Sequence, residues 1–135
     1  MEGRKQEVLY YTDPSGGCPF RDWRGSIADE KAKAAIDARI ARFRGGNFGD
    51  SAPIGAGASE SRIDLGPGFR IYYGRDRDTI VLLRGGDKST QTADIRQAKI
   101  FWTDYKKRKS DESDERAVAN ARLQRRSPQG SKKKP

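Results

Sequence analysis

The N-terminal part of the chain changes from a short apolar run to helical periodicity. Residues 6–12 (QEVLYYT) are rich in apolar side chains, and residues 13–17 (DPSGG) are turn formers, so this stretch predicts a strand followed by a loop. Phe20, Trp23 and Ile27 then recur at the spacing of one helix face. We therefore expect a short helix directly after the loop.

A second helix is predicted over Ala28–Arg44, where apolar residues repeat at helical spacing and charged residues take most other positions. Ser26 and Asp29 have the spacing of a capping box at its start, and Gly45 and Gly46 end the pattern. The repeating apolar residues are Ala32, Ile36, Ile40 and Phe43. We expect the two helices to form a hairpin that packs on a sheet, with its aromatic residues in the core.

The clearest strand pattern lies on either side of a Gly-Pro-Gly turn. The strand after the turn places Phe69, Ile71 and Tyr73 on one face and Arg70 and Tyr72 on the other. A slip of one residue would exchange the two faces, so the apolar pattern must fix the register. If Ile63 lies opposite Phe69, the loop is Asp64–Gly68 and Arg62 lies opposite Arg70. The hairpin thus predicts two adjacent arginines on its polar face.

Two neighbouring segments complete this sheet. Ile80–Leu83 is entirely apolar, which is typical of a central strand, and Arg84 follows at its end. Residues 47–59 are rich in glycine and are expected to be a loop. The stretch GAGAS at Gly55–Ser59 matches neither phosphate-loop fingerprint, so it does not predict a nucleotide site.

The C-terminal part predicts one more helix and then a tail. Ser89 or Thr90 is expected to cap the helix, and Lys106–Lys109 would close it. Its apolar stripe is Ile95, Ala98, Trp102 and Tyr105. Beyond Ser110 the apolar pattern fades, so we expect one domain over residues 1–109 and a basic, disordered tail over residues 110–135.

The formal charge of +9 favours a polyanionic partner such as nucleic acid. Residues 109–135 hold eight basic and four acidic side chains, a net charge of +4, so the body remains basic without its tail. The tail is either an arm that contacts RNA or a neutral extension, and we expect the neutral extension.

One cysteine, Cys18, excludes an internal disulfide and fits a reducing cytoplasm. The absence of histidine excludes Ser-His-Asp and Cys-His catalysis and removes the commonest metal ligand. No apolar run is long enough for a signal peptide or a membrane span, so we expect a cytoplasmic protein that does not contact a membrane.

An enzyme without histidine can still cleave RNA if it positions the 2′-hydroxyl, offsets charge on the phosphorane and moves two protons. Arginine supplies a fixed cation and a bidentate donor to phosphate, but it cannot act as a base. Lysine and tyrosine need a pKa lowered by about 3 units to act near neutral pH, and adjacent guanidinium groups lower it. The predicted polar face offers these groups as Arg62, Arg70, Arg84, Tyr72 and Lys88.

The order of strand, helical hairpin, three antiparallel strands and helix resembles the RelE/ParE superfamily of type II toxins. The segments that carry the resemblance are SESRIDLGPGFRIYY (59–73), LLRGGDKSTQTADIRQAK (82–99), ARIARFRGGNFGD (38–50) and the Pro-Ile-Gly-x-Gly at 53–57, and it covers roughly residues 6–107. Within the superfamily the chain is most similar to the addiction module killer proteins, a HigB-related branch. The resemblance implies an α+β fold, with a small antiparallel-rich sheet packed by an N-terminal helical hairpin and a C-terminal helix.

The resemblance also implies a function. RelE-like members cut mRNA on the translating ribosome, without a metal or cofactor, and a protein antitoxin neutralises them; in this branch it is typically a helix-turn-helix DNA-binding protein. The residues expected to act are Arg62, Arg70, Tyr72 and Lys88 in catalysis, and Arg84, Gln91, Arg96 and Lys99 in RNA binding. Two alternatives remain open: a ParE-like inhibitor of DNA gyrase, and a binding protein that has lost its toxicity.

Overall fold

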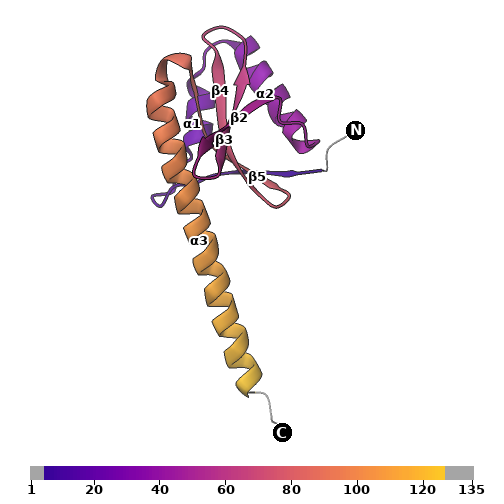
Figure 1. Ribbon diagram of the computed structural model, residues 1–135, viewed down its shortest axis with the longest axis vertical. Coiled ribbons are helices and arrows are strands. Elements are labelled where there is room, and N and C mark those ends of the chain that lie inside the picture. Colours follow the sequence, from indigo (N-terminus) through magenta and orange to yellow (C-terminus); the bar gives the residue numbers. More distant parts are fainter. Residues whose placement is uncertain (1–4, 127–135) are drawn as a thin grey trace. The chain divides into compact units, whose positions relative to one another are not determined.

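A computed structural model describes residues 5–126 of the chain. The protein has an α+β structure, with a five-stranded mixed sheet and a C-terminal helix (Figure 1). The strands are β1 (Glu7–Tyr10), β2 (Asp50–Gly55), β3 (Ala58–Ile63), β4 (Phe69–Asp76) and β5 (Thr79–Asp87). The helices are α1 (Pro19–Ser26), α2 (Glu30–Arg44) and α3 (Gln91–Arg126), and a 3₁₀ turn, η1 (Lys88–Thr90), precedes α3.

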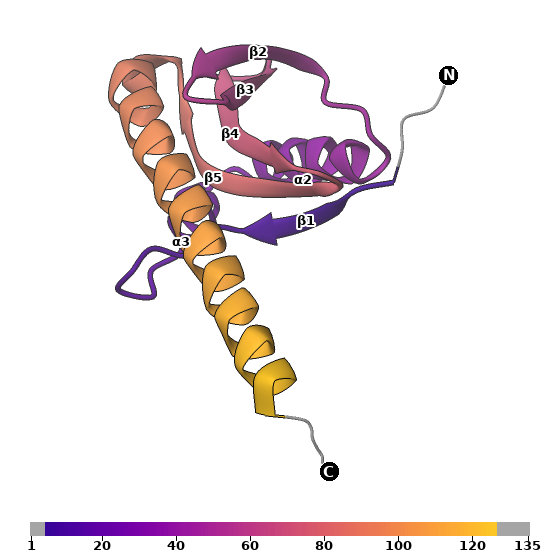
Figure 2. The same ribbon diagram turned by 60° about the horizontal axis from the view of Figure 1, so that its bottom comes forward.

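The strand order across the sheet is β1-β5-β4-β3-β2 (Figure 2). β1 runs parallel to β5, and the other neighbours are antiparallel. Ile63 lies opposite Phe69 and Arg62 opposite Arg70, which confirms the predicted register and the loop Asp64–Gly68. The two arginines are therefore cross-strand neighbours on one face of the sheet.

The glycine-rich segment contains the edge strand β2. Pro53 is tolerated there because an edge strand has a neighbour on one side only. The turn into β3 consists of Ala56 and Gly57, whose φ angles are 58° and 88°. Positive φ at both central residues is the geometry of a type I′ hairpin. The expectation of a continuous loop over residues 47–59 is therefore wrong, because the segment contains two strand segments joined by a tight turn at Ala56 and Gly57.

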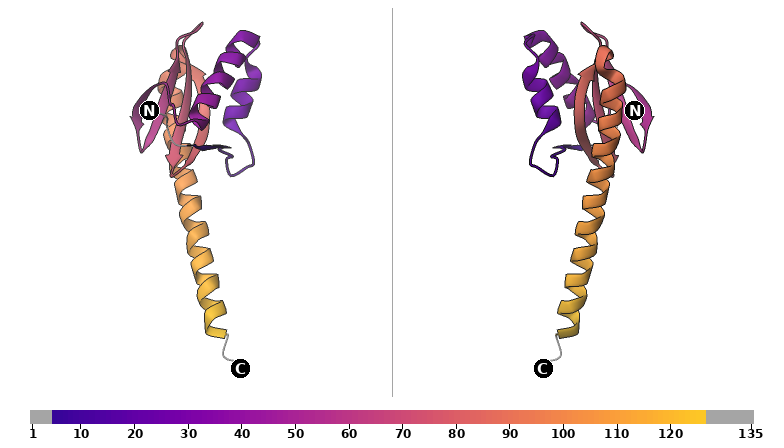
Figure 3. Two further views of the ribbon diagram at one scale, coloured as in Figure 1. Left: turned by 90° about the vertical axis from the view of Figure 1, so that its right-hand side faces the viewer. Right: turned by 90° about the vertical axis from the view of Figure 1, so that its left-hand side faces the viewer.

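One face of the sheet packs against α1 and α2, and the first turns of α3 lie on the other face (Figure 3). The apolar positions predicted for the second helix are all buried, as is Tyr73. The core cluster on this side consists of Phe20, Ala32, Ile36, Ile40, Phe43, Ile63, Phe69, Ile71, Tyr73, Ile80 and Leu82. An ion pair of 2.6 Å between Arg24 Nη2 and Asp37 Oδ2 connects α1 to α2. The hairpin arrangement of these helices stays a prediction.

The cap of α2 differs from the one that the sequence predicts. Ser26 is the last residue of α1, and Asp29 alone caps α2, where its carboxylate accepts a backbone N–H at 2.9 Å. At the 3₁₀ turn before α3, Asp87 caps η1: its carboxylate accepts the backbone N–H of Ser89 at 2.8 Å, and the hydroxyl of Thr90 accepts the backbone N–H of Asp87 at 3.3 Å. The cap of α3 itself at Ser89 or Thr90 stays a prediction. At the start of α2 and of η1, the side chain that accepts the backbone N–H is an aspartate, one of the preferred capping residues.

The helix α3 continues to Arg126, although the sequence pattern predicts an end at Lys109. The chain divides into a compact unit that ends at Thr103 and a second unit that begins at Asp104. Beyond that point good helix formers and ion pairs between residues four apart sustain the helix without an apolar stripe. The expected disorder is corrected for residues 110–126, and residues 127–135 lie outside the described part of the chain.

Candidate functional site

The face of the sheet that α3 covers carries Arg62, Arg70 and Arg84, and we call it the arginine face. Arg62 and Arg70 reach it through the hairpin register. Arg84 reaches it through a β-bulge: Tyr72 pairs with Arg84 but Tyr73 pairs with Leu82, so β5 contains one extra residue. Strict alternation would turn Arg84 toward the α1 and α2 side, and the bulge redirects it. Three adjacent strands thus each place an arginine on one face.

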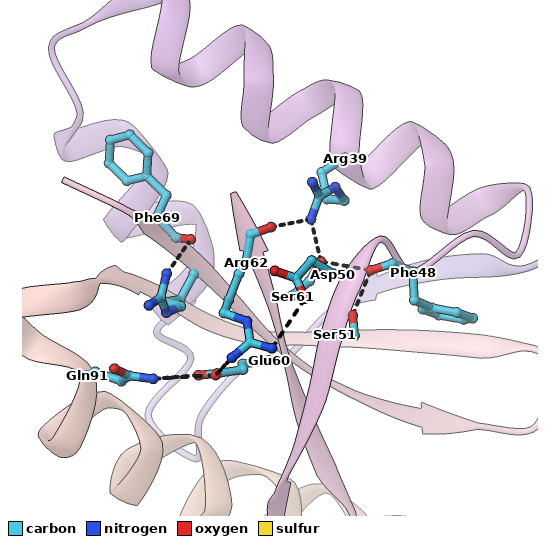
Figure 4. Close-up of polar contacts among 10 residues, drawn as sticks. Arg39, Phe48, Asp50, Ser51, Glu60, Ser61, Arg62, Phe69 and Gln91 are labelled. Atoms are coloured by element: carbon cyan, nitrogen blue, oxygen red, sulfur yellow. Dashed lines mark hydrogen bonds and ion pairs between the residues drawn. The ribbon is translucent and has the colours of Figure 1, made fainter. Parts of the chain in front are cut away.

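Two of these arginines are held by carboxylates. Arg62 Nη2 lies 3.2 Å from Asp50 Oδ1 and Nη1 lies 3.5 Å from Glu60 Oε2 (Figure 4). Arg84 Nε lies 3.4 Å from Asp94 Oδ1, and its Nη1 donates to Gln97 Oε1. Asp94 is buried, with 4% exposure, and the hydroxyl of Thr90 also donates to its carboxylate.

Arg70 differs from the other two. Its Nη1 donates to the backbone oxygens of Gly68 at 3.3 Å and Phe69 at 3.5 Å, and no ion pair joins it to a carboxylate within residues 5–126. Lys88 lies beside it, since a Cβ built on Gly68 would be 3.5 Å from Arg70 Nη1 and 3.6 Å from Lys88 Cβ. Arg70 and Lys88 therefore form a local excess of positive charge at one end of the arginine face.

Asp87 is an acidic residue that lies close enough to Arg70 to interact with its charge. Hydrogen bonds from the side chain and backbone of Ser89 lower the pKa of Asp87, and the charge of Arg70 lowers it further. Its carboxylate caps η1, so it fixes the turn that carries Lys88. The turn positions Lys88, and the carboxylate of Asp87 accepts the hydrogen bonds that cap the turn.

Glu60 is one of several residues of this site that the sequence analysis does not single out, together with Asp50 and Asp94. It is 5% exposed, and its Oε1 accepts from Nε2 of Gln91 at 3.0 Å (Figure 4). It lies opposite Tyr72 in the sheet. A glutamate in a short strand gives no sequence signal of burial, because burial follows from α3 covering this face. Glu60 thus ties Gln91 of α3 to Arg62 of β3.

Tyr72 is fully buried beneath this face. Burial raises the pKa of Tyr72 above its ordinary value of 10.0, and the carboxylates of Glu60 and Asp94 raise it further. The charges of Arg70 and Arg84 lower the pKa of Tyr72, but by less than burial and the two carboxylates raise it. The expectation that the guanidinium groups bring this phenol toward neutrality is therefore wrong. Tyr72 stays protonated at neutral pH, so it cannot be the base.

Replacing Tyr72 by phenylalanine tests this account. The unfolded state releases the phenolic proton near pH 10 and the folded state only at higher pH, so the folded protein loses stability as pH rises above about 10. Tyr72→Phe should unfold within about 1 kcal/mol of wild type at pH 7 and should lose less stability between pH 9 and 11. Urea unfolding across this range measures both, and parallel alkaline losses in the two proteins would contradict the assignment.

The adjacent glycines of β5 serve opposite faces of the sheet. A Cβ on Gly85 would lie 2.1 Å from Cε3 of Trp23, and a Cβ on Gly86 would lie 1.8 Å from Oδ2 of Asp94. The first glycine thus admits a ring of α1, and the second admits the carboxylate that holds Arg84. This close approach explains the Gly-Gly pair of the sequence motif without a phosphate-binding role.

Arg39 supports β3 from α2. Its Nη1 donates to Oγ of Ser61 and to the carbonyl oxygen of Arg62, both at 2.7 Å (Figure 4). Burial lowers the pKa of Arg39, and repulsion from Arg42 adds to the effect. Nothing in the helical periodicity distinguishes Arg39 from the other charged residues of α2. It fixes the backbone of the strand that carries Arg62.

The other predicted RNA-binding residues are distributed differently. Gln91 and Arg84 belong to the arginine face. Lys99 lies elsewhere, since its Nζ would be 3.1 Å from a Cβ on Gly55, at the β2–β3 turn. Arg96 is exposed on α3. The structure therefore places Lys99 at the β2–β3 turn and not in the cluster around Arg70.

Two further observations concern membrane-spanning helices and metal-binding clusters. Across residues 5–126, no helix combines the length and the apolar character needed to cross a membrane. The same residues contain no group of three or more acidic or cysteine side chains that could hold a metal ion.

Comparison with known proteins gives a relative but no activity. No family model and no solved structure matches the chain. A Haemophilus influenzae protein is 48% identical over 83 residues, which make up 61% of this chain and 84% of the relative. The relative is itself named only as an uncharacterized protein. This chain belongs to the same family as that protein.

Proposed function

We propose that this protein is the toxin of a type II toxin–antitoxin pair and that it cuts mRNA on the ribosome. The sequence segments that resemble the addiction module killer branch support the proposal, and we assign the fold to the RelE/ParE type on the same ground. The observation that carries it is the charge on Arg70. Two arginines of the face are ion-paired, whereas within residues 5–126 Arg70 has only backbone acceptors, and it lies beside Lys88.

The proposed chemistry follows from these cations. Arg70 would bind the scissile phosphate with its guanidinium and stabilise the charge that develops on the phosphorane. Lys88 would add a point charge and a proton donor at the same phosphate. Arg62 would join them when its contact with exposed Asp50 opens. Since Tyr72 stays protonated, the proton of the attacking 2′-hydroxyl must pass to another group.

The contact between Arg62 and Asp50 gives a prediction of increased affinity. Asp50 has a side-chain exposure of 69%, and its carboxylate competes with a phosphate for Nη2 of Arg62. Asp50→Asn should therefore tighten binding of a single-stranded oligoribonucleotide several-fold at low salt. Asp37→Asn is the matched control, because it removes the same charge from another exposed ion pair, with Arg24. Equal effects of the two variants in a fluorescence anisotropy titration would show that net charge alone decides.

Expression of the gene alone, with and without the neighbouring antitoxin gene, tests the whole proposal. Growth should stop, the 5′ ends of mRNA should accumulate inside coding regions, and the antitoxin should prevent both. Growth arrest with intact transcripts would contradict ribonuclease action. Trapped gyrase–DNA complexes with intact transcripts would favour the gyrase inhibitor, and unaffected growth would favour a binding protein without toxicity.

A further inference from the structure

We propose that the loop Asp64–Gly68, called here the hairpin loop, forms a subsite for a nucleobase next to the phosphate site at Arg70 and Lys88. Leu65 contacts the face of the base, and the carboxylate of Asp64 accepts a hydrogen bond from the exocyclic amino group of the base. The ligand is therefore an RNA nucleotide that carries cytosine, adenine or guanine rather than uracil. The inference rests on the proposed function and deepens it, since it names the nucleotides that the site prefers.

The hairpin loop lies between the aromatic core and the two cations. A Cβ built on Gly66 would lie 3.6 Å from Cε2 of Phe69, which belongs to the core cluster. A Cβ built on Gly68 would lie 3.5 Å from Nη1 of Arg70 and 3.6 Å from Cβ of Lys88. The loop therefore borders the place at which the two cations would hold a phosphate. The base of the same nucleotide would lie within reach of the loop.

Hydrogen bonds fix the backbone of the hairpin loop. The N–H of Leu65 donates to the carbonyl oxygen of Ile63, and the N–H of Gly68 donates to the carbonyl oxygen of Leu65, both at 3.0 Å. The ring of Pro67 restricts its own φ angle. A loop held in this way loses little conformational freedom when it contacts a ligand, and such preorganisation favours binding.

Leu65 offers an apolar contact beside the cations. Its exposed fraction is 40%. A single exposed leucine is ordinary on a protein surface, but Leu65 lies on a fixed loop next to Arg70 and Lys88, which have no ion pair within residues 5–126. Enzymes that bind a single base commonly pack apolar side chains against it. A nucleotide whose phosphate contacts Arg70 would thus cover Leu65 with its base.

Asp64 determines which bases fit. Its side chain is exposed, and no ion pair joins it to a cation within the described part of the chain. A carboxylate repels phosphate, but it accepts hydrogen bonds from an amino group such as N4 of cytosine. Uracil presents an oxygen at the equivalent position, and two acceptors cannot form a hydrogen bond. The loop is therefore better suited to a base than to a phosphate, and best to a base with an amino group.

The test measures the binding of three probes of equal length. They are 2′-O-methyl oligonucleotides of cytidine, of uridine, and of the same backbone without bases; none has the 2′-hydroxyl that cleavage needs. The full-length chain carries Asp64→Asn or Leu65→Ala. The matched controls are Asp114→Asn, which removes the same charge from an exposed residue of α3, and Leu9→Ala, which truncates a leucine of β1 that is 46% exposed. Fluorescence anisotropy titrations at one salt concentration give the affinities.

The wild type should bind the cytidine probe at least about fivefold more tightly than the uridine probe, as expected for one good polar contact to a base. Asp64→Asn should bring this ratio close to one, because an amide can also donate to the oxygen of uracil. Leu65→Ala should weaken both probes that carry bases several-fold and leave the probe without bases unchanged. Both controls should keep the wild-type ratio. A ratio that Asp64→Asn does not change, or an effect of Leu65→Ala no larger than that of Leu9→Ala, would overturn the proposal.

The subsite and the proposed function can fail separately. A wild type that cleaves mRNA but binds the probe without bases as tightly as the cytidine probe would exclude the subsite alone. A wild type that does not cleave mRNA, but whose preference for cytidine depends on Asp64, would remove the proposed function and leave the subsite established. Arg70→Ala should weaken all three probes, since all carry the same phosphates. A loss confined to the probes with bases would contradict the placement of the phosphate at Arg70.

Discussion

Replacing Arg70 by alanine is expected to lower RNA cleavage by at least about 100-fold, since one preorganised donor to a developing oxyanion is commonly worth that much. Arg70 is the arginine of its face without a carboxylate partner in the described chain, so its charge is available to a phosphate. Its side chain is half-buried and, among the residues that the structure describes, bonds only backbone oxygens, so the fold should lose no more than about 1 kcal/mol.

Two comparisons make this prediction specific. Arg70→Lys should restore only part of the activity, because an ammonium lacks the bidentate fork of a guanidinium. Arg75→Ala removes an exposed arginine from the same strand, where its guanidinium stacks over Phe48 at 4.3 Å, and cleavage should persist. Ribosome-programmed cleavage of a defined mRNA, with urea unfolding as the stability control, measures all three. Full cleavage by Arg70→Ala would exclude Arg70 from the site.

The sequence predicts those parts of the fold where a periodic pattern meets a buried face. The alternation of Phe69, Ile71 and Tyr73 fixes the register, and the register places Arg62 beside Arg70. The apolar spacing of α2 likewise predicts its buried positions. These predictions succeed because burying apolar area favours one pairing over all others.

The remaining features depend on contacts between distant segments. The bulge that turns Arg84 toward α3 changes the alternation of β5 at Leu83, an apolar residue within an apolar run. Glu60 looks like an ordinary strand residue until α3 covers it and Gln91 binds it. The burial that keeps Tyr72 protonated has the same origin. The sequence therefore predicts which residues share a face, but not which of them are paired or covered.

Replacing Gly86 by alanine should destabilise the protein by about 3 kcal/mol, at the upper end of the usual cost of overpacking. The new Cβ would lie 1.8 Å from Oδ2 of Asp94, so the carboxylate must move away from Arg84 within a buried site. Gly25→Ala is the control, and it is expected to change the stability in the opposite direction. A Cβ at Gly25 meets nothing within 4 Å, and in a helix this change stabilises by about 0.5–1 kcal/mol. Urea midpoints should fall for Gly86→Ala and rise for Gly25→Ala, and a wild-type midpoint for Gly86→Ala would show that Asp94 does not lie against β5.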